Sequence, residues 1–153
     1  MTGAPDTAQE ELLLHASCVA VAWAGVLILG PSGCGKSALA LWLMAFGAEL
    51  VVDDYTLIRR AGDSLHARAP ERISGLIEAR EVGILCATPR ESAELVLIVD
   101  LGPQETQRLP PTRRRALLGV ELPLLYGSRT PHFAPAVLQY IKGGCDVRDK
   151  DTP

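Results

Sequence analysis

The sequence has little net charge, few cysteines and no long apolar run, and each shortage excludes a class of protein. A formal net charge of −3 offers no electrostatic attraction to nucleic acid. The apolar stretch at residues 18–29 is broken by Ala24-Gly25 and is too short to span a bilayer. The cysteines form no C-x-x-C pair and are scattered, at Cys18, Cys34, Cys86 and Cys145. Reduced thiols are the simplest interpretation, so we expect a cytoplasmic protein that binds neither nucleic acid nor a membrane.

Length and composition are those of one globular domain. The chain has 153 residues, of which 48% are apolar and 22% are charged, and this balance excludes a disordered protein. The polar, acidic N-terminus is unlike a signal peptide. We expect residues 1–11 to be disordered, residues 12–141 to form the domain, and residues 142–153 to be a disordered tail.

Residues 30–37 complete a phosphate-binding loop of the form G-x-x-x-x-G-K-[ST]. They read Gly30-Pro31-Ser32-Gly33-Cys34-Gly35-Lys36-Ser37. The glycines let successive N–H groups face one anion at a helix N-terminus, Lys36 supplies charge for the outer phosphates, and the Ser37 hydroxyl can ligate Mg²⁺. The apolar runs Val26–Leu29 and Ala38–Leu43 predict a buried strand before the loop and a helix after it. A glycine-rich turn with a coincidental Lys-Ser pair would not explain these neighbours, so we expect binding of a nucleoside triphosphate or a similar polyphosphate.

Two hairpins and one buried helix are expected around this loop. The first hairpin covers residues 18–29, with Ala24-Gly25 as its turn, and the second covers residues 55–67. The helix covers residues 36–46 and is ended by Gly47, because glycine adopts the left-handed conformation that closes a helix. Both tryptophans lie on apolar segments beside the loop and are expected in the core; they are Trp23 and Trp42.

The rest of the chain adds more strands than helices. Strands are expected at residues 49–52, 95–99 and 122–126, with a breaker at Gly102-Pro103, and a short helix is expected at residues 136–141. This layout departs from the regular strand–helix alternation of ordinary nucleotide kinases and GTPases. We therefore expect an α/β fold in which a strand-rich mixed sheet with few helices carries the phosphate-binding loop.

Asp53 and Asp54 directly follow the strand expected at residues 49–52. A carboxylate at the end of a strand after a phosphate-binding loop usually belongs to the Mg²⁺ site. Adjacent residues of a strand point to opposite faces, so one aspartate could hold metal while the other takes a proton from an attacking hydroxyl. The alternative is an acidic strand end without a function, and the phosphate-binding loop upstream counts against it.

Several separated segments, taken in order, carry a resemblance to a known family. They are Leu14-His15, the phosphate-binding loop, Leu50 to Asp54, Leu76 to Ile84 and, more weakly, Gln107-Arg108-Leu109. Over roughly residues 12–141, the chain resembles the catalytic domain of the HPr serine kinase/phosphorylase family, in a short form like those of proteobacteria. The resemblance implies the fold that HPr kinases share with phosphoenolpyruvate carboxykinases.

The resemblance also implies an activity: an ATP- and Mg²⁺-dependent protein serine kinase. Its substrate would be HPr or an HPr-like phosphocarrier, which links the protein to regulation of the phosphotransferase system. The implied catalytic residues are His15, Lys36, Asp53, Arg80 and Arg108, with nucleotide contacts from residues 30–37. The implied metal ligands are Ser37, Asp54 and Glu78. Family members form hexamers, so the resemblance also implies a homo-oligomer.

The implied roles suit phosphoryl transfer, which depends mainly on positioning and charge neutralisation. Asp53 would be the base that activates the acceptor serine, with His15 beside it. Arg80 would belong to the family's catalytic signature loop, which lies within the matched segment Leu76 to Ile84. Arg108 would stabilise the transferring phosphoryl group. Taken singly, these residues have plainer interpretations: His15 as an ordinary histidine, Glu78 with Arg80 as a structural ion pair, and Arg108 as a solvated charge.

Departures from the family pattern favour one direction of the reaction. Glu81 stands where the signature loop normally has glycine, and Ala16 follows His15 where glycine is usual. The segment Tyr126–Phe133 has no lysine, although the family uses a basic loop there for dephosphorylation. Kinase activity is therefore better supported than phosphorylase activity. A nucleotide-binding regulatory module with little or no transfer stays open as an alternative, whereas a small-molecule kinase fits the strand-rich layout badly.

Overall fold

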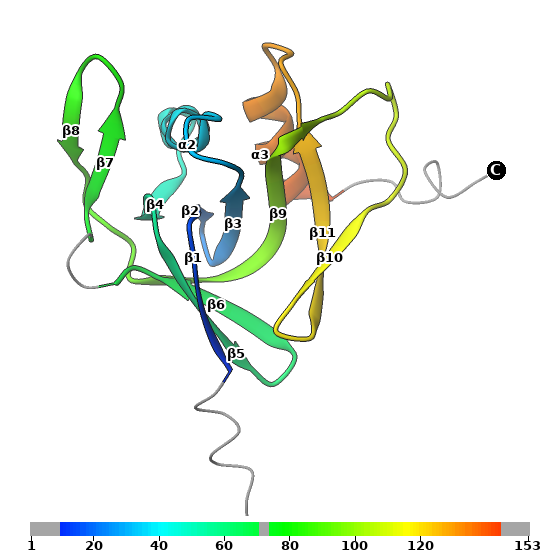
Figure 1. Cartoon of the computed structure of the whole chain (residues 1–153), viewed down its shortest axis with the longest axis horizontal. Helices are drawn as coiled ribbons and strands as arrows, with labels where there is room; N and C mark the ends of the chain where they lie inside the picture. The colour runs from blue at the N-terminus through cyan, green and yellow to red at the C-terminus, as the bar shows by residue number, and fades with distance from the viewer. Residues whose placement is uncertain (1–9, 71–73, 145–153) are drawn as a thin grey trace, which may run out of the picture.

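The computed structural model describes residues 10–70 and 74–144, which form mainly β-strands (Figure 1). The strands are β1 (Glu11–Leu14), β2 (Ser17–Val21), β3 (Ala24–Leu29), β4 (Glu49–Val52), β5 (Thr56–Ala61), β6 (Ser64–Arg68), β7 (Leu76–Ala79), β8 (Gly83–Cys86), β9 (Ser92–Gln104), β10 (Arg114–Leu117) and β11 (Val120–Gly127). The helices are α2 (Lys36–Ala45) and α3 (Phe133–Gly143). This is the strand-rich layout with few helices that the sequence pattern predicts.

Most strands belong to one mixed sheet, and β9 is the strand that connects its parts. The order is β1-β5-β6-β9-β3-β2-β4, and β11 pairs with both β9 and β10. The start of the curved β9 pairs antiparallel with β6, and its later part pairs parallel with β3 and with β11 (Figure 1). β7 and β8 form a separate hairpin that packs against α2. The end of β3, where the phosphate-binding loop begins, therefore lies in the middle of the sheet.

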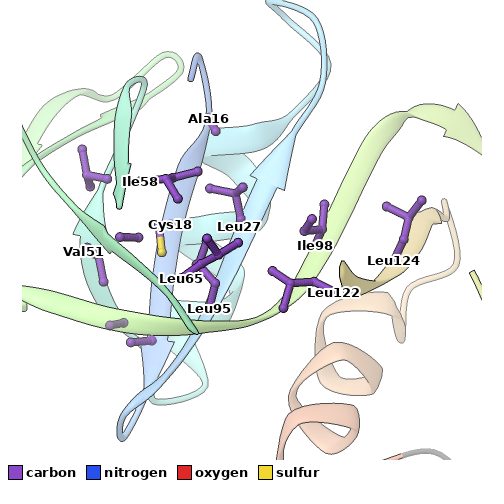
Figure 2. Packing of buried hydrophobic residues seen from close by; sticks show 14 residues of the cluster. Ala16, Cys18, Leu27, Val51, Ile58, Leu65, Leu95, Ile98, Leu122 and Leu124 are labelled. Carbon is purple, nitrogen blue, oxygen red and sulfur yellow. The ribbon is translucent and has the colours of Figure 1, made fainter. Parts of the chain in front are cut away.

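The central strands are apolar throughout because both faces of the sheet are buried. On β3, Leu27 belongs to one core cluster and its neighbour Ile28 belongs to the other. The first cluster fills the space enclosed by the central strands and the β5–β6 hairpin, from which Leu65 points inward (Figure 2). The second cluster joins the sheet to α2 and α3 through residues such as Leu43 and Val137. Both clusters hold β3 and the second also holds α2, so together they fix the two ends of the phosphate-binding loop.

The turn of the first hairpin lies two residues earlier than the sequence suggests. The strands β2 and β3 pair from Ser17↔Ile28 to Val21↔Ala24, so the turn is Ala22-Trp23 and not Ala24-Gly25. Ala22 adopts the left-handed conformation, with φ 55°. Gly25 is needed inside the strand for space, because a Cβ there would lie 3.0 Å from the Cβ of Ala93. Glycine marks a close approach of β9 here, and not a turn.

The expected breaker Gly102-Pro103 does not end the strand that precedes it. β9 runs from Ser92 to Gln104, well beyond the expected residues 95–99. Its pairing with β11 shifts between Asp100 and Gln104, so Pro103 falls in the irregular part of the ladder. A missing N–H costs little where no regular ladder hydrogen bond is made.

Both tryptophans were expected in the core, and this prediction is wrong. Trp23 is 60% exposed in the β2–β3 turn, and Trp42 is 61% exposed on α2. The helix has more apolar residues than positions facing the sheet, so its outer side keeps some of them in water. There the rings of Trp42 and Phe46 stack with centroids 6.0 Å apart. The buried residues of α2, of which Lys36 is the first, therefore all lie on one side of the helix.

The described secondary structure extends slightly beyond residues 12–141, where the domain was expected. Glu11 already pairs with Arg59 in the β1–β5 ladder, and α3 continues to Gly143. The expected disorder of the remaining N-terminal residues and of the tail falls on residues 1–9 and 145–153, which lie outside the described residues. In the described part of the chain, no helix has the length and apolarity that crossing a membrane requires.

Candidate active site

The phosphate-binding loop joins β3 to α2 and is held closed by its own lysine. Lys36 Nζ donates hydrogen bonds to the carbonyl oxygens of Gly30, at 2.8 Å, and Pro31, at 3.1 Å. Gly35 precedes the helix with φ 104°, a conformation that favours glycine, and no side chain in the described part of the chain caps α2. The N–H groups of its first turn therefore have no side-chain acceptor, which is the arrangement that binds a phosphate.

Gly30 is required by packing within the loop. A Cβ at this position would overlap the sulfur of Cys34 and lie 3.3 Å from the Cβ of Leu101 at the end of β9. The partly buried Cys34 thus lies behind the loop, against Gly30, and supports its curvature from the side away from the pocket.

The Asp53 carboxylate accepts hydrogen bonds from three different segments. The hydroxyl of Ser17 donates to Oδ1 at 2.7 Å, and the backbone N–H of Glu78 donates to Oδ2 at 3.1 Å. The hydroxyl of Ser37 lies 2.8 and 2.9 Å from Oδ1 and Oδ2. Asp53 is only 5% exposed, and a buried carboxylate needs such donors to keep its charge. Asp53 therefore joins β2, the start of α2 and the β7 strand.

Asp54 points the opposite way and pairs with His15. The Asp54 side chain is 62% exposed, and its Oδ1 lies 2.9 Å from Nε2 of His15. The backbone of Asp54 has φ 80°, so the chain turns sharply at the end of β4. The Tyr55 ring also lies near His15, with ring centroids 5.1 Å apart. The expected pairing of His15 with Asp53 is wrong, because the first aspartate of the pair points inward and the second outward.

A pocket of ≈ 450 Å³ brings together residues from segments far apart in the sequence. The lining residues come from the segment at the start of β2, the loop and α2, the turn after β4 and the β7–β8 hairpin. They include His15, Ser17, Ser32, Gly33, Gly35, Lys36, Ser37, Ala38, Asp54, Glu78, Ala79, Arg80 and Val82. Glu78 lies on β7, whereas Arg80 lies in the turn that follows it. The phosphate-binding loop, the His15–Asp54 pair and the β7–β8 hairpin thus share one pocket, as a phosphoryl-transfer site requires.

Arg108 is not brought to this pocket. It lies exposed in the segment between β9 and β10, away from the residues that line the cavity. The ends of that segment are anchored, because Glu105 pairs with Arg113 and the Arg113 guanidinium lies 4.3 Å from the centroid of the Tyr126 ring. Arg108 itself lies between these anchors, so its implied contact with a transferring phosphoryl group stays a prediction.

The oxygen donors at the pocket suit Mg²⁺ better than a transition metal. In the described residues there is no group of three or more His, Cys, Asp or Glu side chains that could hold a metal ion by themselves. Mg²⁺ at phosphate sites needs only one or two protein oxygens, because phosphates and water complete its octahedron. Ser37 and Glu78 line the pocket and Asp53 holds the Ser37 hydroxyl, so this donor set fits such an ion.

The turn of the β7–β8 hairpin contains a residue with a strained backbone conformation. Glu81 adopts φ 70°, a left-handed conformation that costs a non-glycine residue about 1–2 kcal/mol. This is the position at which family members are expected to have glycine. We expect Glu81→Gly to raise the free energy of unfolding by about 0.5–1 kcal/mol, since part of the relieved strain is offset by the greater flexibility of glycine when unfolded.

Denaturant unfolding of Glu81→Gly and Glu81→Ala checks this expectation. Alanine removes the same charge but keeps the Cβ, so Glu81→Ala should leave the midpoint nearly unchanged. Equal gains in both variants would mean that charge, and not backbone strain, governs stability at Glu81.

Sequence reasoning missed two buried hydroxyl residues beside the site. Ser17 bonds Asp53, and Thr56 Oγ1 donates to the carbonyl oxygen of Ala16 at 2.8 Å. For both residues, the sequence feature that could have indicated a buried hydrogen bond was a polar residue at the end of an apolar strand. The neighbouring Cys18 has no such role: burial raises the pKa of its thiol to about 12, so it stays protonated and unreactive.

Comparison with known proteins agrees with the fold. The family model of the HPr Serine kinase C-terminal domain matches residues 6–108. The HPr kinase/phosphorylase of Caldanaerobacter subterraneus subsp. tengcongensis is 40% identical over 60% of this chain and 32% of its own length. That of Geobacillus thermodenitrificans is 38% identical over 80% of this chain and 42% of its own length. The chain therefore spans less than half of these relatives.

A solved structure has the same fold over most of the chain. It is the Hpr(Ser) kinase/phosphatase from Coxiella burnetii, with a TM-score of 0.71, 25% identity, and coverage of 86% of this chain and 88% of that one. The mixed sheet, the phosphate-binding loop and the family model lead to one conclusion: the chain belongs to the HPr serine kinase C-terminal domain family.

Proposed function

We propose that the protein is a cytoplasmic, ATP- and Mg²⁺-dependent protein serine kinase that phosphorylates HPr or an HPr-like phosphocarrier. The observation that carries the proposal is the shared pocket, in which the loop's Lys36 and Ser37 lie together with the His15–Asp54 pair. A phosphate-binding loop alone would serve any nucleotide-binding protein. A carboxylate held by a histidine beside that loop is what a transfer to a hydroxyl group needs. The names of the curated relatives support the substrate class.

In this proposal Asp54, and not Asp53, is the base. The Asp54 side chain is exposed to the pocket, and among the described residues its hydrogen-bond partner is His15, which can orient it and share its charge. Asp53 is buried, already accepts hydrogen bonds from Ser17, Ser37 and a backbone N–H group, and is not among the residues that line the pocket, so it is poorly placed to reach an acceptor serine. This assignment exchanges the roles that the family resemblance implied for the two aspartates.

The phosphates would be bound by the loop's N–H groups and by Lys36. Lys36 now donates to the Gly30 and Pro31 carbonyl oxygens, and a bound phosphate offers it a charged acceptor in their place. Ser37 and Glu78 would hold Mg²⁺, which when bound neutralises charge on the phosphate oxygens. Arg80, in the turn beside Glu78, adds positive charge on the side of the pocket facing the loop.

The alternative of a purely regulatory nucleotide-binding module is less well supported. Binding requires the loop but no base, and the His15–Asp54 pair would then have no use in the pocket. The reverse reaction, in which phosphate attacks phosphoserine, is proposed to be weaker than the kinase reaction. The segment Tyr126–Phe133 offers only Arg129 and His132 as side chains that could attract an attacking phosphate.

Incubation of the purified protein with Mg²⁺, γ-labelled ATP and HPr-like proteins of the same organism tests the function. We expect one phosphoserine on the acceptor, located by mass spectrometry, and no labelling of an acceptor whose target serine is changed to alanine. Adding unlabelled phosphate afterwards should remove the label more slowly than it was added. Tight MgATP binding without labelling of any acceptor would instead identify a regulatory module.

A further inference from the structure

Ser17 is a fully buried hydroxyl that contacts both aspartates of the site. Its side chain is 0% exposed at the start of β2, and its Oγ donates to Asp53 Oδ1 at 2.7 Å. The same oxygen lies 3.5 Å from the backbone N of Asp54, at the outer limit of a hydrogen bond. A hydroxyl has one proton to donate and lone pairs to accept with, so Ser17 can make both contacts at once.

We propose that Ser17 is a positioning residue that fixes the Asp53 carboxylate, and through it the direction of the Ser37 hydroxyl. Ser17 holds Oδ1 and the Glu78 N–H holds Oδ2, so the plane of the carboxylate is pinned at both ends. Ser37 then lies almost equally far from Oδ1 and Oδ2, at 2.8 and 2.9 Å. Its single proton is committed inward to Asp53, which leaves its lone pairs for the pocket.

Removing the Ser17 hydroxyl would unpin one end of the carboxylate. Asp53 Oδ1 would keep Ser37 as its remaining donor, and the carboxylate could rotate about its Cβ–Cγ bond. The Ser37 oxygen would lose its fixed direction toward the site at which Mg²⁺ is proposed to bind. Loss of a residue that orients a metal ligand typically reduces metal affinity or activity by about 10–100-fold. The inference rests on the proposed function, because it concerns the Mg²⁺ that accompanies ATP.

Thr56 supplies a matched control for the buried hydroxyl. Like Ser17 it is 0% exposed, and it also bridges the segment before β2 to the segment after β4. Its Oγ1 donates to the Ala16 carbonyl oxygen, however, and not to a carboxylate. Thr56→Val therefore deletes a buried hydrogen bond in the same place without touching Asp53 or Ser37. A merely structural role for Ser17 predicts the same behaviour for both variants.

The test measures how much Mg²⁺ strengthens ATP binding, by titration calorimetry with ATP in EDTA and with ATP in Mg²⁺. In Ser17→Ala, we expect the Mg²⁺-dependent gain in affinity to fall at least about tenfold, while metal-free ATP affinity stays within about twofold of the wild type. Ser17→Thr, which keeps the hydroxyl, should restore the gain. Thr56→Val should unfold at a lower temperature but keep the full gain. If Ser17→Ala does not fold, Ser17→Cys takes its place, because a thiol is a weak donor of similar size.

The outcomes separate the positioning role of Ser17 from the proposed kinase activity. An unchanged Mg²⁺ gain in folded Ser17→Ala, or an equal loss in Thr56→Val, would overturn the positioning role. A wild-type protein without any Mg²⁺ gain would overturn it as well, together with the proposed metal dependence. A loss confined to Ser17→Ala in a protein that labels no phosphocarrier would leave the positioning role standing and refute the proposed kinase activity.

Discussion

Asp54→Asn should bind MgATP as the wild type does and phosphorylate its acceptor about 10³-fold more slowly. A positioned base typically contributes about 10²–10⁴-fold, and an amide cannot take the proton of a serine hydroxyl. The nucleotide should still bind because Asp54 is not among the hydrogen-bond partners of the loop residues Lys36 and Ser37. Single-turnover transfer from labelled ATP gives the rate, and calorimetric titration gives the affinity.

The matched control is Asp53→Asn, which should show the opposite pattern. Asp53 accepts from both Ser17 and Ser37, and an amide would turn one of its ends from an acceptor into a donor. We expect weaker MgATP binding and a shift of the Mg²⁺ dependence to higher concentration. If Asp53→Asn instead binds MgATP normally and is inactive while Asp54→Asn is active, the original assignment from family resemblance is right and the exchange of roles is wrong.

The phosphate-binding loop could be predicted from the sequence because its physics is local. Glycines with positive φ, a lysine and a serine at fixed spacing determine a loop between strand and helix without help from distant residues. The observed ends agree, with β3 stopping at Leu29 and α2 starting at Lys36. Strands 49–52 and 122–126 were predicted for the same reason, since their apolar runs and turn residues are contiguous.

The partners of Asp53 and Asp54 could not be predicted in this way. Strand alternation predicts that the two side chains diverge, and they do, but it does not say which one faces the pocket. Which aspartate faces the pocket depends on how the start of β2 lies beside the end of β4, because Ser17 contacts the inward carboxylate and His15 contacts the outward one. The contacts join residues 36 and 39 positions apart, a separation that only the tertiary fold decides.

Tertiary context also explains the errors at Gly25 and at Trp42. The sequence pattern assigns glycine to turns, whereas Gly25 is required by the approach of β9 within the sheet. The pattern likewise assigns a large aromatic residue to the core, whereas α2 offers only one side to the sheet and leaves Trp42 stacked on Phe46 in solvent. Periodicity was too weak on this apolar helix to show which side is buried.

The largest effect on binding is expected from Lys36. Lys36→Ala should weaken MgATP binding by at least about 100-fold, equivalent to about 2.7 kcal/mol, because it removes the point charge that is proposed to face the outer phosphates. The same change deletes the hydrogen bonds that cross the loop to Gly30 and Pro31, so the free loop should also become less rigid. The fold itself should survive, since both core clusters lie outside the loop.

Lys36→Met separates the charge of this residue from its packing. Lys36 is only 7% exposed, and methionine keeps most of the volume of the buried stem while removing the ammonium group. If charge carries the binding, Lys36→Met should lose as much MgATP affinity as Lys36→Ala while unfolding closer to the wild-type temperature. Circular dichroism follows the unfolding, and calorimetry with MgATP gives the affinity. Near-wild-type affinity in either folded variant would show that residues 30–37 do not bind the nucleotide phosphates, and the proposed kinase site would fall with them.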